Sequence, residues 1–534
     1  MRRRALGLCG VVGTSILVFV LAGVGGGGAL SASTTSSTAV PPASASASDW
    51  TVYHGNALGT GVATGVTSVD LSTRSWTSPA LDGELYGEPL AAGGRVYVAT
   101  ENDTIYALSA ATGAVVWTTH LAVPVPSGDL PCGDITPTVG ITGTPVIDTA
   151  RSELFAVADE LRAGMPAHVL VGLDLTSGKV ELDQDVDPGG ASPAALLQRT
   201  GLTLDAGRVV FGMGGNYGDC ASYRGRVFAV PEGGGTPAVF TVDGAAGQNQ
   251  GAVWMGGGAP VVDAGGNVWV STGNGSVYSA SQPYDNSDSV LELSSSMTLL
   301  QYFAPSSWPA NNAHDLDMSI APALLSDGQV VLAGKSRIVY LLNGSSLGGI
   351  GSQEASLGDA CGNDIDGGVA VSGTTVYLPC LDGPIAVTTT ASPATLHLLW
   401  SASVGGGPPV VAAGLVWTIG QNGILYGLNP RTGAAQQQAT VGVPANHFPT
   451  PSVGDGFLLV PTSDRVVAFA ASSTAASTTT SSTTAATSTT TARTTTTVPP
   501  GQQGTSPWVF AGAVLAGLVV IGALSWYVRR KTGR

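Results

Sequence analysis

Oxygen-bearing side chains gather in the middle of the chain, between residues 254 and 343. They occur in the segments STGNGS, YDNSDSV and HDLDM, and a lysine follows in AGKSRIVYLLN. Carboxylate and amide oxygens are the ligands that calcium takes from proteins, and these segments contain both kinds of group. Asn274 lies between glycines, as turn residues do. Asp285 and Asp288 lie in a polar loop and Lys335 follows a glycine, so each residue also suits a structural role.

The cysteines favour disulfides. The first of five, Cys9, lies in an N-terminal apolar run that has the pattern of a signal peptide and is discarded with it. Four cysteines remain, an even number, and they allow three pairings. We predict that Cys132 pairs with Cys220. The second predicted pair, Cys361 with Cys380, closes adjacent strands of one repeat and their loop.

Other kinds of chemistry lack the residue spacing that they need. The six histidines show neither His-x-x-His nor Glu-x-x-His spacing, which argues against zinc chemistry, and no nucleophile triad stands out. A glycine-rich segment at residues 214–225 contains Asp219 and Tyr223, which either line a pocket or brace the loop, and we favour bracing. No predicted helix follows these glycines, so they are not a nucleotide fingerprint.

Composition favours an all-β protein outside the nucleic-acid-binding classes. The 534 residues include 75 glycines, only 11% are charged, and the formal net charge is -15. Such a chain is poor in helix formers. It also lacks the clusters of Lys and Arg that neutralise phosphates, so DNA and RNA are not expected partners.

The two ends of the chain predict its compartment. The start is basic, then apolar, then rich in small residues, as in a signal peptide. The uncharged stretch WVFAGAVLAGLVVIGALSWYV is long enough to span a membrane, and arginines and a lysine follow it, which places the C-terminus in the cytoplasm. The resulting plan is a signal peptide (1–32), a disordered linker (33–48), a folded body (49–470), a Ser/Thr-rich stalk (471–506), a transmembrane helix (507–528) and a basic tail (529–534). We therefore expect a monomeric, single-pass bacterial membrane protein whose body lies outside the cytoplasm.

The body contains eight copies of one short pattern. In the copy GEPLAAGGRVYVATENDTIYAL, apolar alternations are separated by Gly, Asp or Asn turns. The copies begin near residues 89, 145, 203, 260, 322, 369, 409 and 451. Short strands at such a period, with no helical pattern between them, predict a β-propeller. We expect eight blades, with seven as the alternative, and we expect residues 70–80 to supply the outer strand that closes the ring.

These repeats resemble a known superfamily. The segment DGELYGEPLAAGGRVYVATENDTIYALSAATGAVVW is similar to the repeat of pyrroloquinoline-quinone-type propellers, the quinoprotein alcohol dehydrogenase-like superfamily, in which a stacked tryptophan, here Trp117, docks neighbouring blades. The opening segment DWTVYHGNALGTG is also similar. The resemblance covers essentially the whole body and implies the propeller fold.

The resemblance also implies a site for pyrroloquinoline quinone and calcium. It places Asn274 as a calcium ligand, Asp285 as the catalytic base with Asp288 as its substitute, and Lys335 and Trp254 at the quinone. The chain departs from the dehydrogenases because it has no two adjacent cysteines and because Trp254 precedes its glycines rather than following them.

Two functions follow from these observations. The first is a membrane-anchored, non-catalytic propeller that binds a protein, a glycan or a small ligand at the mouth of its central funnel. The second is a quinoprotein dehydrogenase that uses pyrroloquinoline quinone and calcium to oxidise an alcohol or a sugar. The missing vicinal cysteines favour the first, because a shared fold does not carry a shared function.

Overall fold

The computed structural model describes residues 49–187, 189 and 192–473. The chain divides into two compact units, 1–475 and 476–534, and every described residue belongs to the first. The predicted signal peptide, linker, transmembrane helix and tail lie outside the described residues, as does nearly all of the stalk. Within the described part of the chain, no helix is long and apolar enough to cross a membrane.

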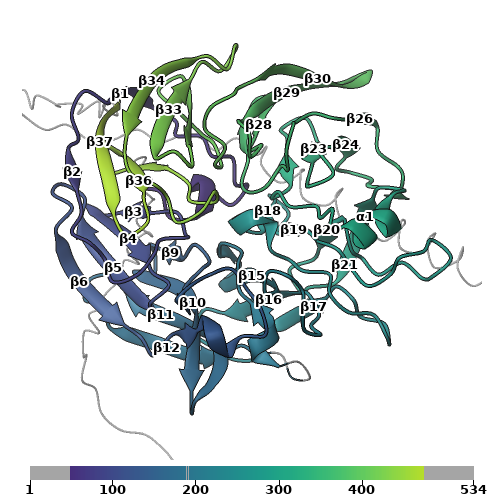
Figure 1. The fold of residues 1–534 in the computed structure, drawn as a ribbon, viewed down its shortest axis with the longest axis horizontal. Helices are drawn as coiled ribbons and strands as arrows, with labels where there is room; N and C mark the ends of the chain where they lie inside the picture. Colours follow the sequence, from purple (N-terminus) through teal and green to yellow (C-terminus); the bar gives the residue numbers. More distant parts are fainter. Residues whose placement is uncertain (1–48, 188, 190–191, 474–534) are drawn as a thin grey trace, which may run out of the picture. The chain divides into compact units, whose positions relative to one another are not determined.

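The described residues form eight sheets of four or five strands that follow one another around a ring (Figure 1). The prediction of an eight-bladed β-propeller is confirmed, and the seven-bladed alternative is wrong. Blade 1 contains β3 (Leu90–Ala92), β4 (Arg95–Ala99), β5 (Thr104–Ser109) and β6 (Val115–His120); blade 2 contains β9 (Val146–Asp148), β10 (Glu153–Arg162), β11 (Met165–Asp174) and β12 (Val180–Asp185). Blade 3 contains β13 (Leu196–Leu197), β14 (Thr203–Asp205), β15 (Arg208–Gly215), β16 (Arg226–Pro231) and β17 (Ala238–Thr241); blade 4 contains β18 (Val261–Val262), β19 (Val268–Ser271), β20 (Val290–Leu293), β21 (Leu299–Ala304) and β25 (Gly349–Ile350).

The second half of the ring repeats this plan. Blade 5 contains β22 (Ala323–Leu324), β23 (Gln329–Leu332), β24 (Val339–Asn343) and β26 (Ala355–Leu357); blade 6 contains β27 (Ala370–Ser372), β28 (Thr375–Leu378), β29 (Ile385–Ala391) and β30 (Ala394–Ser401). Blade 7 contains β31 (Val410–Ala412), β32 (Leu415–Ile419), β33 (Ile424–Leu428) and β34 (Ala435–Thr440). A short ribbon of β7 (Val125–Pro126) and β8 (Thr138–Val139) and one short helix, α1 (Trp308–His314), lie between blades in the described chain.

Blade 8 closes the ring by joining both ends of the folded body. It contains β35 (Ser452–Gly454), β36 (Phe457–Pro461) and β37 (Val466–Ser473), and the early strands β1 (Val66–Asp70) and β2 (Trp76–Thr77) pair with β37. The prediction that an early strand closes the ring is therefore confirmed. The predicted bounds, residues 70–80, are too late, because the outer strand begins at Val66, which pairs with Ser473. The same pairing carries the last strand beyond the predicted end of the body at residue 470.

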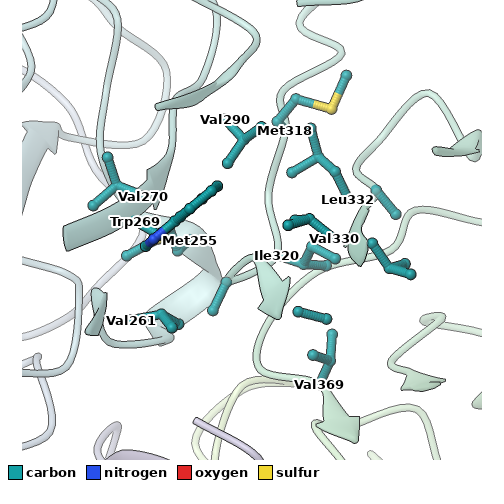
Figure 2. Close-up of a cluster of buried hydrophobic side chains, with 14 of the residues drawn as sticks. Met255, Val261, Trp269, Val270, Val290, Met318, Ile320, Val330, Leu332 and Val369 are labelled. Carbon is teal, nitrogen blue, oxygen red and sulfur yellow. The ribbon is translucent and has the colours of Figure 1, made fainter. Parts of the chain in front are cut away.

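Within a blade, the strands nearest the axis of the ring are more buried than the outer strands. The inner strands β3 and β35 are buried along their whole length, whereas the outer strands β6 and β12 alternate between more and less exposed residues. This alternation is expected where one face of an edge strand meets solvent. Between blades, apolar faces interdigitate; Figure 2 shows Trp269, Val270 and Val290 of blade 4 facing Val330 and Leu332 of blade 5.

At three of the interfaces between blades, a tryptophan from an outer strand packs against the next blade. The indoles of Trp76, Trp117 and Trp400 pack so closely on Gly113, Gly178 and Gly433 of the next blade that a Cβ there would lie 2.4 to 2.5 Å from a ring carbon. Each indole Nε1 also donates a hydrogen bond to a carbonyl of that blade, at Ala110, Leu175 and Pro430 respectively. The docking role expected for Trp117 is observed, and two further copies of it occur.

The segment from Trp50 to Val62 crosses the middle of the ring (the purple segment in Figure 1). It includes the turn η1 (Tyr53–Gly55). Backbone hydrogen bonds join it to the inner strands of blades 1, 2, 4, 6 and 7, through Ala91, Ile147, Val262, Val371 and Val411. One chain segment that pairs with five blades holds their inner strands at fixed positions around the axis.

Candidate functional site

A cavity of about 880 Å³ lies where segments from around the ring converge. The residues that line it come mostly from loops, both between blades and between strands of one blade, and range in sequence from Tyr86 to Phe448. Strand ends of a propeller meet around its axis, so residues that are distant in the chain become neighbours there. Three of the predicted site residues, Trp254, Asn274 and Lys335, line this cavity together.

One side of the cavity contains an ion pair built around Lys335. Its Nζ lies 2.6 Å from Oδ2 of Asp317 and 3.2 Å from Oδ2 of Asp315, and it lies 5.1 Å from the centre of the Trp254 ring. Burial alone would lower the pKa of Lys335, but the two carboxylates outweigh it and hold that pKa above its ordinary value. Lys335 is therefore charged, and its charge is balanced by Asp317.

Asn274 and α1 hold Asp317 in this position. The backbone N–H of Asn274 donates to Oδ1 of Asp317 at 2.6 Å. The side chain of Asn312 in α1 accepts from the N–H of Gly275 and donates to the carbonyl of Val277, both at 2.7 Å, which fixes the helix against this loop. Asp317 lies three residues beyond the end of α1. Residues 314–317 of the segment HDLDM line the cavity, whereas no residue of the YDNSDSV segment does.

Asp285, the predicted base, does not line the cavity, and neither does its predicted substitute Asp288. Both are fully buried. Oδ1 of Asp285 accepts a hydrogen bond from the hydroxyl of Ser287 at 2.6 Å, and both oxygens of Asp288 lack a hydrogen-bond partner. Burial raises the pKa of each carboxyl above its ordinary value. The structure thus separates Asp285 from the cavity that Asn274, Lys335 and Trp254 share.

The opposite side of the cavity contains Arg199, which the sequence interpretation missed. Its side chain is buried, at 6% exposure, and its guanidinium carbon lies 4.5 Å from the centre of the Phe448 ring and 5.8 Å from that of Tyr86. Nη2 has no hydrogen-bond partner, and Arg199 forms no ion pair with any described residue. Burial lowers the pKa of Arg199. The available signal was that Arg199 is the only charged residue between Asp187 and Asp205.

An aromatic surface connects the two sides. The rings of Trp254 and Phe448 meet edge to face with centroids 6.1 Å apart, below Lys335 and Arg199 respectively. Nearby, burial raises the pKa of Asp366 to about 7 and lowers that of His447 to about 4. His447 is therefore neutral at pH 7. Glu101 and Asp134 act on Arg199 electrostatically without forming an ion pair with it.

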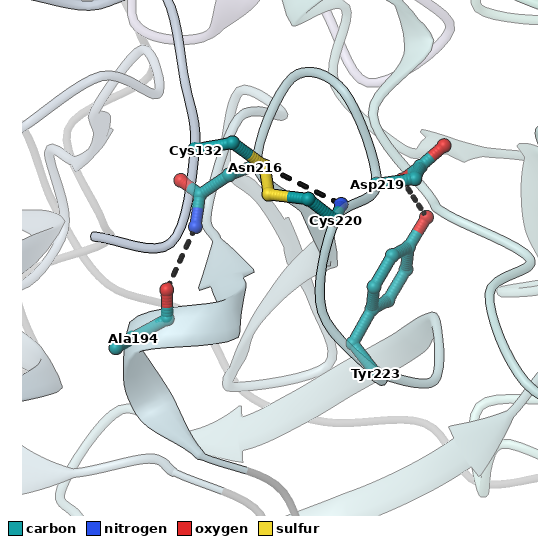
Figure 3. Close-up of a disulfide and its surroundings, with 6 residues drawn as sticks. All are labelled: Cys132, Ala194, Asn216, Asp219, Cys220 and Tyr223. Atoms are coloured by element: carbon teal, nitrogen blue, oxygen red, sulfur yellow. Dashed lines mark hydrogen bonds between the residues drawn. A yellow bond between two sulfur atoms is a disulfide. The ribbon is translucent and has the colours of Figure 1, made fainter.

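Both predicted disulfides are confirmed, and each holds a loop of the cavity. Cys132–Cys220 fixes the loop that carries Asp219, whose Oδ1 accepts a hydrogen bond from the hydroxyl of Tyr223 at 2.7 Å (Figure 3). Asp219 and Tyr223 both line the cavity, so the bond that braces the loop also shapes the wall. Cys361–Cys380 encloses the segment that brings Asp366 to the cavity.

The donors present fit a flat anionic molecule better than they fit calcium. The unpaired guanidinium and the two aromatic rings would accept carboxylates on an aromatic frame. A calcium site needs several free oxygen ligands, but Asp317 is bound by Lys335 and Asp285 lies elsewhere. Across the described ranges, no group of three or more His, Cys, Asp or Glu residues is placed to hold a metal ion.

The chain is similar to proteins of one propeller class. A family model described as outer membrane protein assembly factor BamB matches residues 62–300. No curated protein sequence matches the chain.

Solved structures extend the likeness to the whole ring. The quinohemoprotein alcohol dehydrogenase of Comamonas testosteroni is 15% identical with a TM-score of 0.59, covering 79% of this chain and 80% of its own. The corresponding enzyme ADHIIG of Pseudomonas putida HK5 is 12% identical with a TM-score of 0.59, covering 90% and 85%. A europium-containing methanol dehydrogenase is 14% identical with a TM-score of 0.57, covering 78% and 90%. At these identities the likeness concerns the fold.

Proposed function

We propose that this chain, whose repeats and fold are similar to those of pyrroloquinoline-quinone-type β-propellers, is a binding module whose ligand is a small aromatic anion held in the central cavity. The module works outside the cytoplasm, anchored by the segment 507–528. The buried, unpaired guanidinium of Arg199 is the observation that carries this proposal.

A guanidinium taken out of water without a counter-ion costs several kcal/mol, on the order of the whole stability margin of a domain. A protein with 36 acidic residues could place one beside Arg199, yet none forms an ion pair with it among the described residues. An anionic ligand would supply the missing charge. The rings of Trp254 and Phe448 would contact its flat part.

Benzoate is a minimal probe of this chemistry, because it carries one carboxylate on one ring. Isothermal titration is expected to show benzoate binding to the wild-type protein, and Arg199→Met is expected to abolish it. The control is Arg431→Gln, which removes an exposed arginine that does not line the cavity. Binding that survives in Arg199→Met, or no binding to the wild type, would contradict the proposal.

The second candidate is a quinoprotein dehydrogenase, favoured by the convergence of Trp254, Asn274 and Lys335 on one cavity. Bound pyrroloquinoline quinone would supply hydride-accepting chemistry. Its test is dye-linked oxidation of alcohols or sugars after addition of the quinone and calcium. Turnover after this addition would favour the dehydrogenase, whereas quinone binding without turnover favours the binding module.

A further inference from the structure

A second cavity, of about 490 Å³, opens beside blade 3 and is lined by hydrogen-bond donors. Arg224 and Arg226 both line it, together with the side chains of Ser222, Gln248 and Asn249. None of the described residues that line it is acidic. The cavity therefore combines two positive charges with neutral polar groups. The carboxyl of Asp243 interacts electrostatically with Arg224, but it does not line the cavity and forms no ion pair with either arginine.

The backbone explains why both guanidiniums point into the same space. Arg226 begins β16, and Arg224 forms a parallel bridge with Gln250. In extended chain, residues two apart point to the same side. Gly225 between them packs so tightly on Gly251 that a Cβ would lie 1.7 Å from its carbonyl oxygen, so this segment is held firmly in place.

Neither arginine has a carboxylate partner. No ion pair joins Arg224 or Arg226 to another described residue, and Nη1 of Arg226 is buried without a hydrogen bond. Arg224 donates one long bond, 3.4 Å, to the carbonyl of Ala245. Burial, and then the neighbouring charge of Arg224, lowers the pKa of Arg226. The two guanidiniums repel each other in the free protein.

We propose that Arg224 and Arg226 form a binding site for a phosphate group, carried by a phosphate monoester. Two guanidiniums match the near-double negative charge of such a group at pH 7, and each presents paired N–H donors of the geometry that phosphate oxygens accept. The cavity is much larger than one phosphate, so Gln248 and Asn249 remain to contact the rest of the molecule. The proposal does not depend on the occupant of the central cavity.

Isothermal titration with inorganic phosphate, glucose 6-phosphate and acetate at constant ionic strength tests the site. We expect phosphate to bind, and Arg224→Gln and Arg226→Gln each to weaken it by about tenfold or more. Arg431→Gln is the charge-matched control, and Arg199→Met keeps the second site intact, so both are expected to bind phosphate as the wild type does. Tighter binding of glucose 6-phosphate than of inorganic phosphate identifies the ester as the preferred source of the group.

Thermal unfolding separates a binding role from a structural one. If Arg226 serves a ligand, Arg226→Gln is as stable as the free wild type or more stable, and phosphate no longer raises its melting temperature. If Arg226 serves the fold, the variant melts lower and still responds to phosphate, which would overturn the proposal. Acetate binding tighter than phosphate, or no phosphate binding at all, would also overturn it.

Discussion

The contact between Trp400 and Gly433 offers a sharp test of how the blades are held. Gly433 has φ +69, and a Cβ there would lie 2.5 Å from Cε3 of Trp400. Gly414, in the same blade, has φ +73 and nothing within 4 Å of its Cβ position. Alanine at either site carries the left-handed penalty of about 1 kcal/mol. Only Gly433→Ala adds overpacking, so we expect it to cost about 2–4 kcal/mol in all.

Equilibrium unfolding in urea, followed by tryptophan fluorescence, measures both variants. Trp400→Ala itself is expected to cost about 3–5 kcal/mol, because it leaves a cavity and removes the indole hydrogen bond to Pro430. In that background the obstacle to an alanine at residue 433 is gone, so the cost of Gly433→Ala should fall to that of Gly414→Ala. Equal costs for the two glycine variants in the wild-type background would refute the idea that indole packing locks the joint.

Three further predictions concern the site and its surroundings. Lys335→Met should lower the free energy of unfolding in urea by about 3 kcal/mol, because it leaves Asp317 buried without its cation. Adding Asp317→Asn to this variant should recover most of the loss. No recovery in the double variant would contradict the pairing. Burial raises the pKa of Asp243 from its ordinary 3.8 to about 8, so the folded protein keeps a proton that the unfolded chain has lost, and stability should fall as the pH rises from about 4 to about 8. Asp243→Asn should make the free energy of unfolding less dependent on pH in this range. An unchanged pH dependence in the variant would show that Asp243 is not its cause. Replacing Cys361 and Cys380 by serine should cost about 3 kcal/mol, measured by thermal unfolding without reductant, and an unchanged melting temperature would show that the bridge does not constrain the chain.

The fold could be predicted because its signal is repeated. Each blade has the same alternation and turns, so eight weak matches support one another, and the closure by an early strand follows from the ring itself. The exact bounds of that strand could not be predicted, since the pairing of Val66 with Ser473 depends on where two distant segments meet. Two disulfides were expected because four cysteines remained to be paired, but their number alone left three possible pairings.

The site was only partly predictable because burial and pairing are properties of the folded ring. Asn274, Lys335 and Trp254 do converge: Asn274 and Lys335 follow the second strands of neighbouring blades, and Trp254 lies in the connection between blades 3 and 4. Asp285 has the same kind of sequence neighbours, but its side chain is buried beside Ser287 and does not line the cavity. The sequence marks Arg199 only as the one charged residue between Asp187 and Asp205, and the structure shows that it is buried and forms no ion pair with a described residue.

The unpaired arginines form the strongest argument that this propeller binds anions. The chain has 36 acidic residues against 21 basic ones, so a carboxylate is the commonest charged neighbour that an arginine could meet. The exposed Arg151 and the half-buried Arg162 do pair with carboxylates. Arg199, which is buried and gains more from a counter-charge, does not, and neither does Arg226, which is half-buried but has a buried Nη1 without a hydrogen bond. Since burial makes an uncompensated charge more costly, the absence of partners at these positions in the described chain is best explained by a counter-charge that arrives with a ligand.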